Sequence, residues 1–279
     1  YYAYRAVYLV DGGPDLTRRQ MRAAVITGFG GFFARGGGAL DKYALEAAGA
    51  DERDAKVRVS SLAGMEHGVL ALVGEAAAIA VLIAGYKSPP ADFSVPWAVI
   101  PLPGFLVAFW AANRYRDRFR GRGGWGAKLG VFLDSIYLIR DLFVQPRRYW
   151  RPLLGMAGFW LSEIFAGWAG LHAFGFGMNG ATFIVGFGTG MVFTRRTGPL
   201  AGAGILALVL AVTVWYSGAP FGAAVAGIFA YRFLSLWLPM PVALATLPVL
   251  REMGHERVPG AEQKGEGLGE PALEERASA

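Results

Sequence analysis

Cysteine is absent from this 279-residue chain, which excludes disulfides, thiolate nucleophiles and cysteine-ligated metals. Histidine is scarce: His67, His172 and His255 lie far apart, without the spacing of a metal-binding motif. We therefore expect neither a metal nor a cofactor. Charged residues make up only 17% of the chain, whereas a soluble domain has roughly 25%.

Apolar residues make up 54% of the chain, the mean hydropathy is positive, and the apolar residues come in long runs, which predicts a multi-pass membrane protein. Most of the net charge of +6 lies in residues 113–151, which hold ten Arg or Lys and three Asp. By the positive-inside rule this basic loop is cytoplasmic, so its charge indicates topology and not a nucleic-acid partner. The chain begins with Tyr rather than Met, and we expect that a segment before it is missing.

The apolar runs predict an all-α, polytopic helix bundle that occupies residues 1–252. Residues 21–34 hold too few apolar residues for a crossing, which needs roughly 20, so they favour a broken or re-entrant helix. Residues 38–62 are amphipathic and predicted to lie at the surface. Residues 126–144 predict a helix that is interfacial or packed under the bundle rather than a crossing, and the polar residues 253–279 predict a disordered tail. The expected membrane spans are 65–86, 94–112 with proline kinks, 152–174, 199–217 and 221–250, and residues 176–194 are uncharged and rich in glycine.

A glycine-rich block occurs twice in the same context. Gly28-Phe29-Gly30 precedes Arg35, and Gly186-Phe187-Gly188 precedes Arg195. Each block is followed by a helical run, a Gly-Ala pair and an Ala-rich helix that carries one main charge. This order predicts an internal, inverted repeat with halves at about 21–112 and 152–250, joined by the basic loop 113–151.

The candidate site residues are ionisable groups within or beside apolar sequence. Glu163 and Glu75 lie within predicted spans, where a charge is costly and either faces a cavity or has a structural partner. Arg35, Arg195 and Arg196 flank glycine-rich turns. They are candidates for binding a lipid phosphate, and the alternative is that they snorkel to the interface.

Glu66 and Arg232 occupy equivalent places in the two halves of the predicted repeat, and their charges are opposite. An unpaired Arg at membrane depth is costly, so we expect the two side chains to pair or to share one ligand phosphate. The carboxylates of the first amphipathic stretch are interpreted as a solvated helix face: Asp41, Glu46, Asp51, Glu52 and Asp54.

Two stretches resemble the transmembrane, or flippase, region of the bacterial lysylphosphatidylglycerol synthase/flippase family. They are GFFARGGGALDKYALEAAGADERDAKVRVSSLAGMEH in the first half, and GPLAGAG followed by AYRFLSLWLP in the second. The chain looks like a divergent, stand-alone member, because Ala39 and Ala207 stand where the family usually has Glu. The soluble aminoacyl-transferase domain of the two-part enzymes is not in this chain, so the resemblance implies lipid translocation rather than lipid aminoacylation.

The sequence thus predicts a lipid translocase-like protein of the bacterial inner membrane that binds or moves an amphiphile with an anionic headgroup. The basic loop and the C-terminus would be cytoplasmic. Two alternatives stay open, a membrane-embedded lipid-modifying transferase and a scaffold for such an enzyme. The expected partners are anionic membrane lipids, together with a lipid-modifying enzyme or further copies of this chain, and not nucleic acid.

Overall fold

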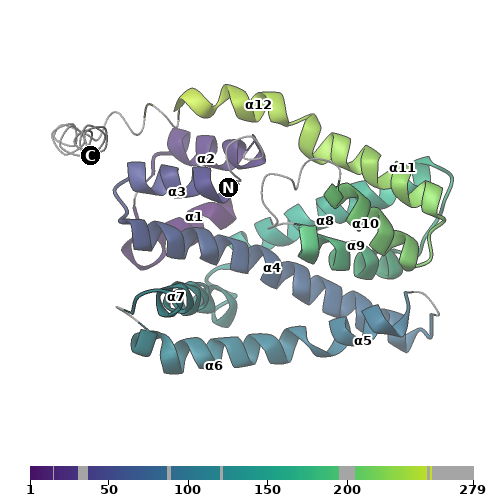
Figure 1. The fold of residues 1–279 in the computed structure, drawn as a ribbon, viewed down its shortest axis with the longest axis horizontal. Coiled ribbons are helices and arrows are strands. Elements are labelled where there is room, and N and C mark those ends of the chain that lie inside the picture. Colours follow the sequence, from purple (N-terminus) through teal and green to yellow (C-terminus); the bar gives the residue numbers. More distant parts are fainter. Residues whose placement is uncertain are drawn as a thin grey trace, which may run out of the picture.

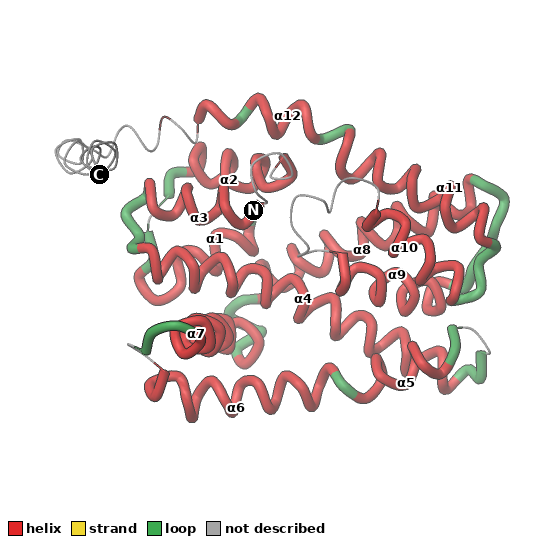
Figure 2. Tube along the Cα trace, viewed as in Figure 1, coloured by secondary structure: helices red, strands yellow, loops and turns green. Residues whose placement is uncertain are grey.

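The computed structural model describes residues 1–14, 16–30, 37–86, 89–119, 122–194, 205–249 and 252. Almost all of these residues are helical, and no strand occurs among them (Figure 2). The all-α prediction is therefore confirmed. The α-helices are α1 (Tyr2–Leu9), α2 (Arg18–Gly30), α3 (Gly37–Ala47), α4 (Glu52–Ile83), α5 (Ala91–Val99), α6 (Pro101–Phe119), α7 (Trp125–Val144), α8 (Trp150–Ala173), α9 (Gly180–Thr194), α10 (Ile205–Tyr216), α11 (Phe221–Arg232) and α12 (Met240–Ala245).

Two helical stretches are long and apolar enough to cross a membrane, α4 and the 25-residue stretch Phe221–Ala245. A third crossing is formed if α5 and α6 count as one span, because they meet at an angle of 40° at the proline-rich break that the sequence predicted. These lengths agree with a membrane protein. The helix α4 starts earlier than the span predicted over 65–86, since Asp51 caps its N-terminus by accepting a hydrogen bond from the Asp54 N–H (2.7 Å).

The helix α4 is the axis of the molecule (Figure 1). Helices α6 and α7 lie on one side of it, and α7 packs against both α4 and α6. Helices α11 and α12 run along the opposite edge, and helices α1–α3 and α8–α10 fill the space between. The helix predicted over 126–144 is α7. The predicted basic loop 113–151 is largely helical, because α6 extends to Phe119 and α7 occupies its middle.

Helices α3 and α10 end in the same type of cap, at the two Gly-Ala pairs. Gly49 and Gly218 have φ of 99° and 111°, a left-handed conformation that favours glycine. The next N–H closes the cap in both cases: Ala50 donates to the Leu45 carbonyl (3.0 Å) and Ala219 to the Val214 carbonyl (3.3 Å). Each glycine therefore ends one helix and lets the chain turn into the next.

Helices α8 and α11 cross closely at two glycines. A Cβ atom on Gly227 would lie 2.9 Å from the Leu171 nitrogen and 3.1 Å from the Gly170 carbonyl carbon. Backbone atoms cannot move aside as a flexible side chain can. The small residues therefore set the distance between the two helices.

We predict that Gly227→Ala lowers the free energy of unfolding by about 1–3 kcal/mol, because the added methyl group forces these helices apart. Gly222→Ala is the matched control, since Gly222 is exposed on the same helix with open space around it. Alanine should be neutral or slightly stabilising there. Thermal unfolding of both variants in detergent checks the prediction, which is wrong if the two midpoints agree.

Candidate functional site

The C-terminal end of α1 is fixed to α4 by the buried side chain of Arg58. Its Nη1 donates to the carbonyls of Val7 (3.1 Å), Tyr8 (2.8 Å) and Val10 (2.8 Å). Its Nε donates to Asp54 Oδ2 at 2.7 Å. A cation at this position satisfies carbonyls that the end of a helix leaves without partners and complements the helix dipole. The arrangement holds Tyr8 in the core.

Asp41 lies on the buried face of α3 and not on a solvated face. Its neighbours at the helical spacing, Ala44, Leu45 and Ala48, are buried as well. Asp41 is only 5% exposed. The interpretation of this carboxylate as part of a solvated face is therefore wrong, because the helix turns it toward α1 and α4.

The other carboxylates of this region form ion pairs, most of them at the surface, or cap a helix. Glu46 pairs with Lys42 (3.3 Å), and Glu52 pairs with Lys42 (3.1 Å) and Lys56 (2.8 Å). Asp51 caps α4, and Asp54 pairs with Arg58. These acids already have partners, so they do not gather into a catalytic group with Asp41.

Two buried polar atoms have no hydrogen-bond partner. They are Oδ1 of Asp41 on α3 and the hydroxyl oxygen of Tyr8 on α1. Tyr8 is fully buried and packs edge-on against the ring of Tyr4, with centroids 5.5 Å apart. Buried polar atoms without partners are rare and costly, so such atoms often mark a place where a proton, water or ligand binds. We call Asp41, Tyr8 and Glu66 the first cluster.

The carboxyl of Asp41 has a raised pKa, at about 8. Burial is the main cause, because it removes water from the charged form, and the charge of Glu66 adds to the rise. The hydroxyls of Tyr8 and Tyr4 act in the opposite direction and lower it. Burial likewise raises the pKa of Tyr8, with a further contribution from Asp41.

Glu66 lies where α4 meets α8. Its backbone carbonyl accepts a hydrogen bond from Nε1 of Trp160, which is fully buried on α8 (2.8 Å). Its carboxylate acts on Asp41 and Tyr8 through its charge. The predicted site residue Glu66 is thus part of the first cluster.

The second cluster is formed by Glu163 on α8 with Tyr231 and Arg232 on α11. The Tyr231 hydroxyl donates to Oε2 of Glu163. Tyr231 is fully buried, and the Arg232 guanidinium lies 5.6 Å from the centroid of its ring. Directly after Arg232 the helix widens into a π-helical segment, Phe233–Trp237, in which Leu238 donates to the Phe233 carbonyl (2.9 Å). Such segments often occur at functional sites.

We expected Glu66 and Arg232 to pair or to share one ligand. Among the described residues no ion pair joins Glu66 to Arg232. A ligand shared by these two residues stays a prediction. Arg35, Arg195 and Arg196 lie outside the described residues. In the part of the chain that is described, no three metal-ligating side chains come together.

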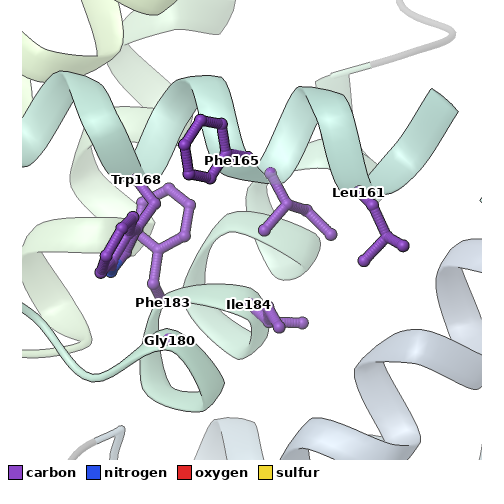
Figure 3. A pocket seen from close by; sticks show the side chains of 7 residues that line it. Leu161, Phe165, Trp168, Gly180, Phe183 and Ile184 are labelled. Atoms are coloured by element: carbon purple, nitrogen blue, oxygen red, sulfur yellow. The ribbon is translucent and has the colours of Figure 1, made fainter. Parts of the chain in front are cut away.

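An apolar groove of about 390 Å³ lies between α8 and the start of α9 (Figure 3). The only polar atom of the Trp168 side chain, Nε1, already donates a hydrogen bond to the Met178 carbonyl (2.8 Å). The groove therefore suits a hydrocarbon chain better than a polar ligand. Its lining residues are Leu161, Ile164, Phe165, Trp168, Gly180, Phe183 and Ile184.

In comparisons with known proteins, no family model, no curated protein and no solved structure matches this chain.

Proposed function

We propose that this protein is a lipid translocase-like membrane protein that binds and moves an amphiphile with an anionic headgroup, as its resemblance to the lysylphosphatidylglycerol synthase/flippase region implies. The observation that carries the proposal is the pair of buried ionisable clusters in a bundle with helices of membrane-crossing length. Ionisable groups inside a membrane are costly, and they usually face a substrate path or a polar partner.

Four short helices support broken or re-entrant segments. Helices α2, α3, α9 and α10 contain 13, 11, 15 and 12 residues, whereas a crossing needs roughly 20. The matching caps at Gly49 and Gly218 support the internal, inverted repeat, since they follow α3 and α10 in the same order. Transporters with such repeats bind substrate where broken helices meet.

The basic side chains supply the anionic preference of the proposed site. Arg232 belongs to the second cluster, and the glycine-flanking Arg35, Arg195 and Arg196 would add further phosphate-binding groups. The apolar groove between α8 and α9 would receive an acyl chain of the same lipid. A lipid-modifying transferase receives less support, because the carboxylates of α3 and of the start of α4 are paired, capping or separately buried.

The orientation belongs to the same proposal. Trp125 and Trp150 are 84% and 51% exposed at the ends of α7 and α8 that face the basic residues. The Arg116 guanidinium lies 3.3 Å from the centroid of the Tyr137 ring. Exposed aromatic residues beside basic ones are typical of a membrane interface on the cytoplasmic side.

We predict that reporters fused after Gly123 and at the C-terminus both report a cytoplasmic location. An alkaline phosphatase fusion should be inactive and a fluorescent protein fusion bright at both places. A fusion after Gly85, which the bent span α5–α6 separates from the basic region, serves as the control for the opposite face. Reporters at Gly123 and at the C-terminus on opposite sides would refute the topology.

Lipid movement is tested in reconstituted vesicles with acyl-labelled fluorescent phosphatidylglycerol, and with phosphatidylcholine as the neutral comparison. Dithionite added outside destroys the label in the outer leaflet, so a protein-dependent loss of the inner-leaflet signal reports translocation. We expect faster loss for the anionic lipid and a several-fold slower rate in Arg232→Gln, because a charge-assisted hydrogen bond to the phosphate is lost.

The control variant is Arg151→Gln, which removes an exposed arginine from α8 and should keep the rate. Absence of protein-dependent movement for both lipids, with folded protein in the vesicles, contradicts the translocase proposal. Equal movement of both lipids with no effect of Arg232→Gln contradicts the anionic headgroup alone.

A further inference from the structure

We infer that Asp41 is a proton-binding site of this protein, completed by Tyr8 and Glu66, and that proton uptake there accompanies lipid movement. The second half of this inference rests on the proposed function, and the first half does not. Water is the donor and the acceptor of the proton. The Asp41 carboxyl releases its proton to water when the site opens and takes up a proton from water before the site closes.

The geometry isolates Asp41 between three helices. The residue lies on the buried stripe of α3, Tyr8 reaches it from α1, and Glu66 belongs to α4. Oδ1 of Asp41 and the hydroxyl of Tyr8 are both buried and without a hydrogen-bond partner. The Tyr8 hydroxyl can donate to the ionised carboxylate, and this contact lowers the pKa of Asp41. Burial has the larger effect and favours the protonated form.

Among the described residues, the basic side chains of α3 and α4 nearest to Asp41 have other partners. Arg58 uses its guanidinium for three carbonyls and for Asp54. Lys42, the next residue on α3, points toward Glu46 and Glu52. A buried carboxylate without a cation becomes neutral by taking up a proton.

The groups that face Asp41 also favour the protonated form on balance. Glu66 on α4 repels the ionised carboxylate, while Tyr8 and Tyr4 on α1 stabilise it to a smaller extent than burial destabilises it. The resulting pKa of about 8 lies close to physiological pH. A modest change in hydration or in the distance to Glu66 would therefore release or bind the proton.

Infrared difference spectra of the purified protein test the site without any lipid assay. Between about pH 6 and about pH 10 the wild type should lose the C=O band of a protonated carboxyl, and Asp41→Asn should lack this change. Glu46→Gln, on the same helix, is the control and should keep it. Tyr8→Phe should move the midpoint to higher pH, because the hydroxyl lowers the pKa, whereas Tyr2→Phe on the exposed face of α1 should not.

The coupling is tested by imposing a pH gradient on the reconstituted vesicles. We expect the gradient to change the rate for the wild type several-fold and to leave Asp41→Asn unaffected. A carboxyl band that titrates unchanged in Asp41→Asn overturns the proton site. If the carboxyl band titrates but the rate of lipid movement does not change with the pH gradient, the coupling is overturned. A titrating band with no lipid movement under any condition overturns the proposed function and leaves the proton site standing.

Discussion

Replacing Arg58 with glutamine is expected to lower the free energy of unfolding by about 3–5 kcal/mol, the cost of removing one partner from a buried charged network. The guanidinium is almost completely buried and satisfies three carbonyls at the end of α1 as well as Asp54. Glutamine is shorter and has a single amide group, so it cannot serve both the carbonyls and the carboxylate. The loss should release α1 from α4 and expose Tyr8.

The matched control is Lys56→Gln, two residues away on the same helix, which removes a surface ion pair with Glu52. An exposed pair of this kind contributes roughly 0–1 kcal/mol. Arg58→Lys should fall between the two variants, because it keeps the charge and loses the planar fork. The measurement is the thermal midpoint in detergent, followed by tryptophan fluorescence. Equal midpoints for Arg58→Gln and Lys56→Gln would show that the network does not hold α1.

Local signals in the sequence predicted several elements closely. The helix predicted over 126–144 is α7, and the prolines near residue 100 mark the break between α5 and α6. The glycines of the Gly-Ala pairs adopt the conformation that ends a helix. These features depend on the chemistry of a few adjacent residues, so they can be predicted from the sequence without knowledge of the tertiary structure.

Asp41 and Arg58 were missed because residues 38–62 were judged by their total charge. A position-by-position reading contains the signal: Asp41 precedes Ala44, Leu45 and Ala48 at helical spacing, and all four are buried. A charged residue within an apolar stripe either has a buried partner or changes its protonation state. Arg58 has a buried partner, and the raised pKa of Asp41 favours a change of its protonation state.

The partners of the remaining charges depend on which helices pack against each other, and the sequence pattern does not predict that packing. Tyr231 donates to Glu163 because α8 packs on α11, although the two residues are 68 positions apart. The pair expected between Glu66 and Arg232 was derived from the repeat alone. A repeat predicts equivalent local positions, but contact between those positions depends on how the two halves pack.

The second large effect expected is a loss of stability with rising pH that depends on Asp41. In the unfolded chain its carboxyl titrates near 3.8, and in the folded protein near 8. Between these values the folded state holds a proton that the unfolded state has lost. Its contribution is therefore fully present below about pH 4 and disappears as the pH rises to about 8, at roughly 1.4 kcal/mol per pH unit.

From about pH 5.5 to about pH 8.5 the wild type should thus lose about 3 kcal/mol through this residue, measured as unfolding free energy or as a falling thermal midpoint. Asp41→Asn carries a neutral group of the same shape at every pH, so its curve should be flatter by that amount and cross above the wild type at alkaline pH. Glu46→Gln, whose carboxylate lies in a surface ion pair on the same helix, should follow the wild type. Parallel curves for the wild type and Asp41→Asn would mean that the carboxyl keeps one protonation state throughout this range, and that the buried cluster binds no proton.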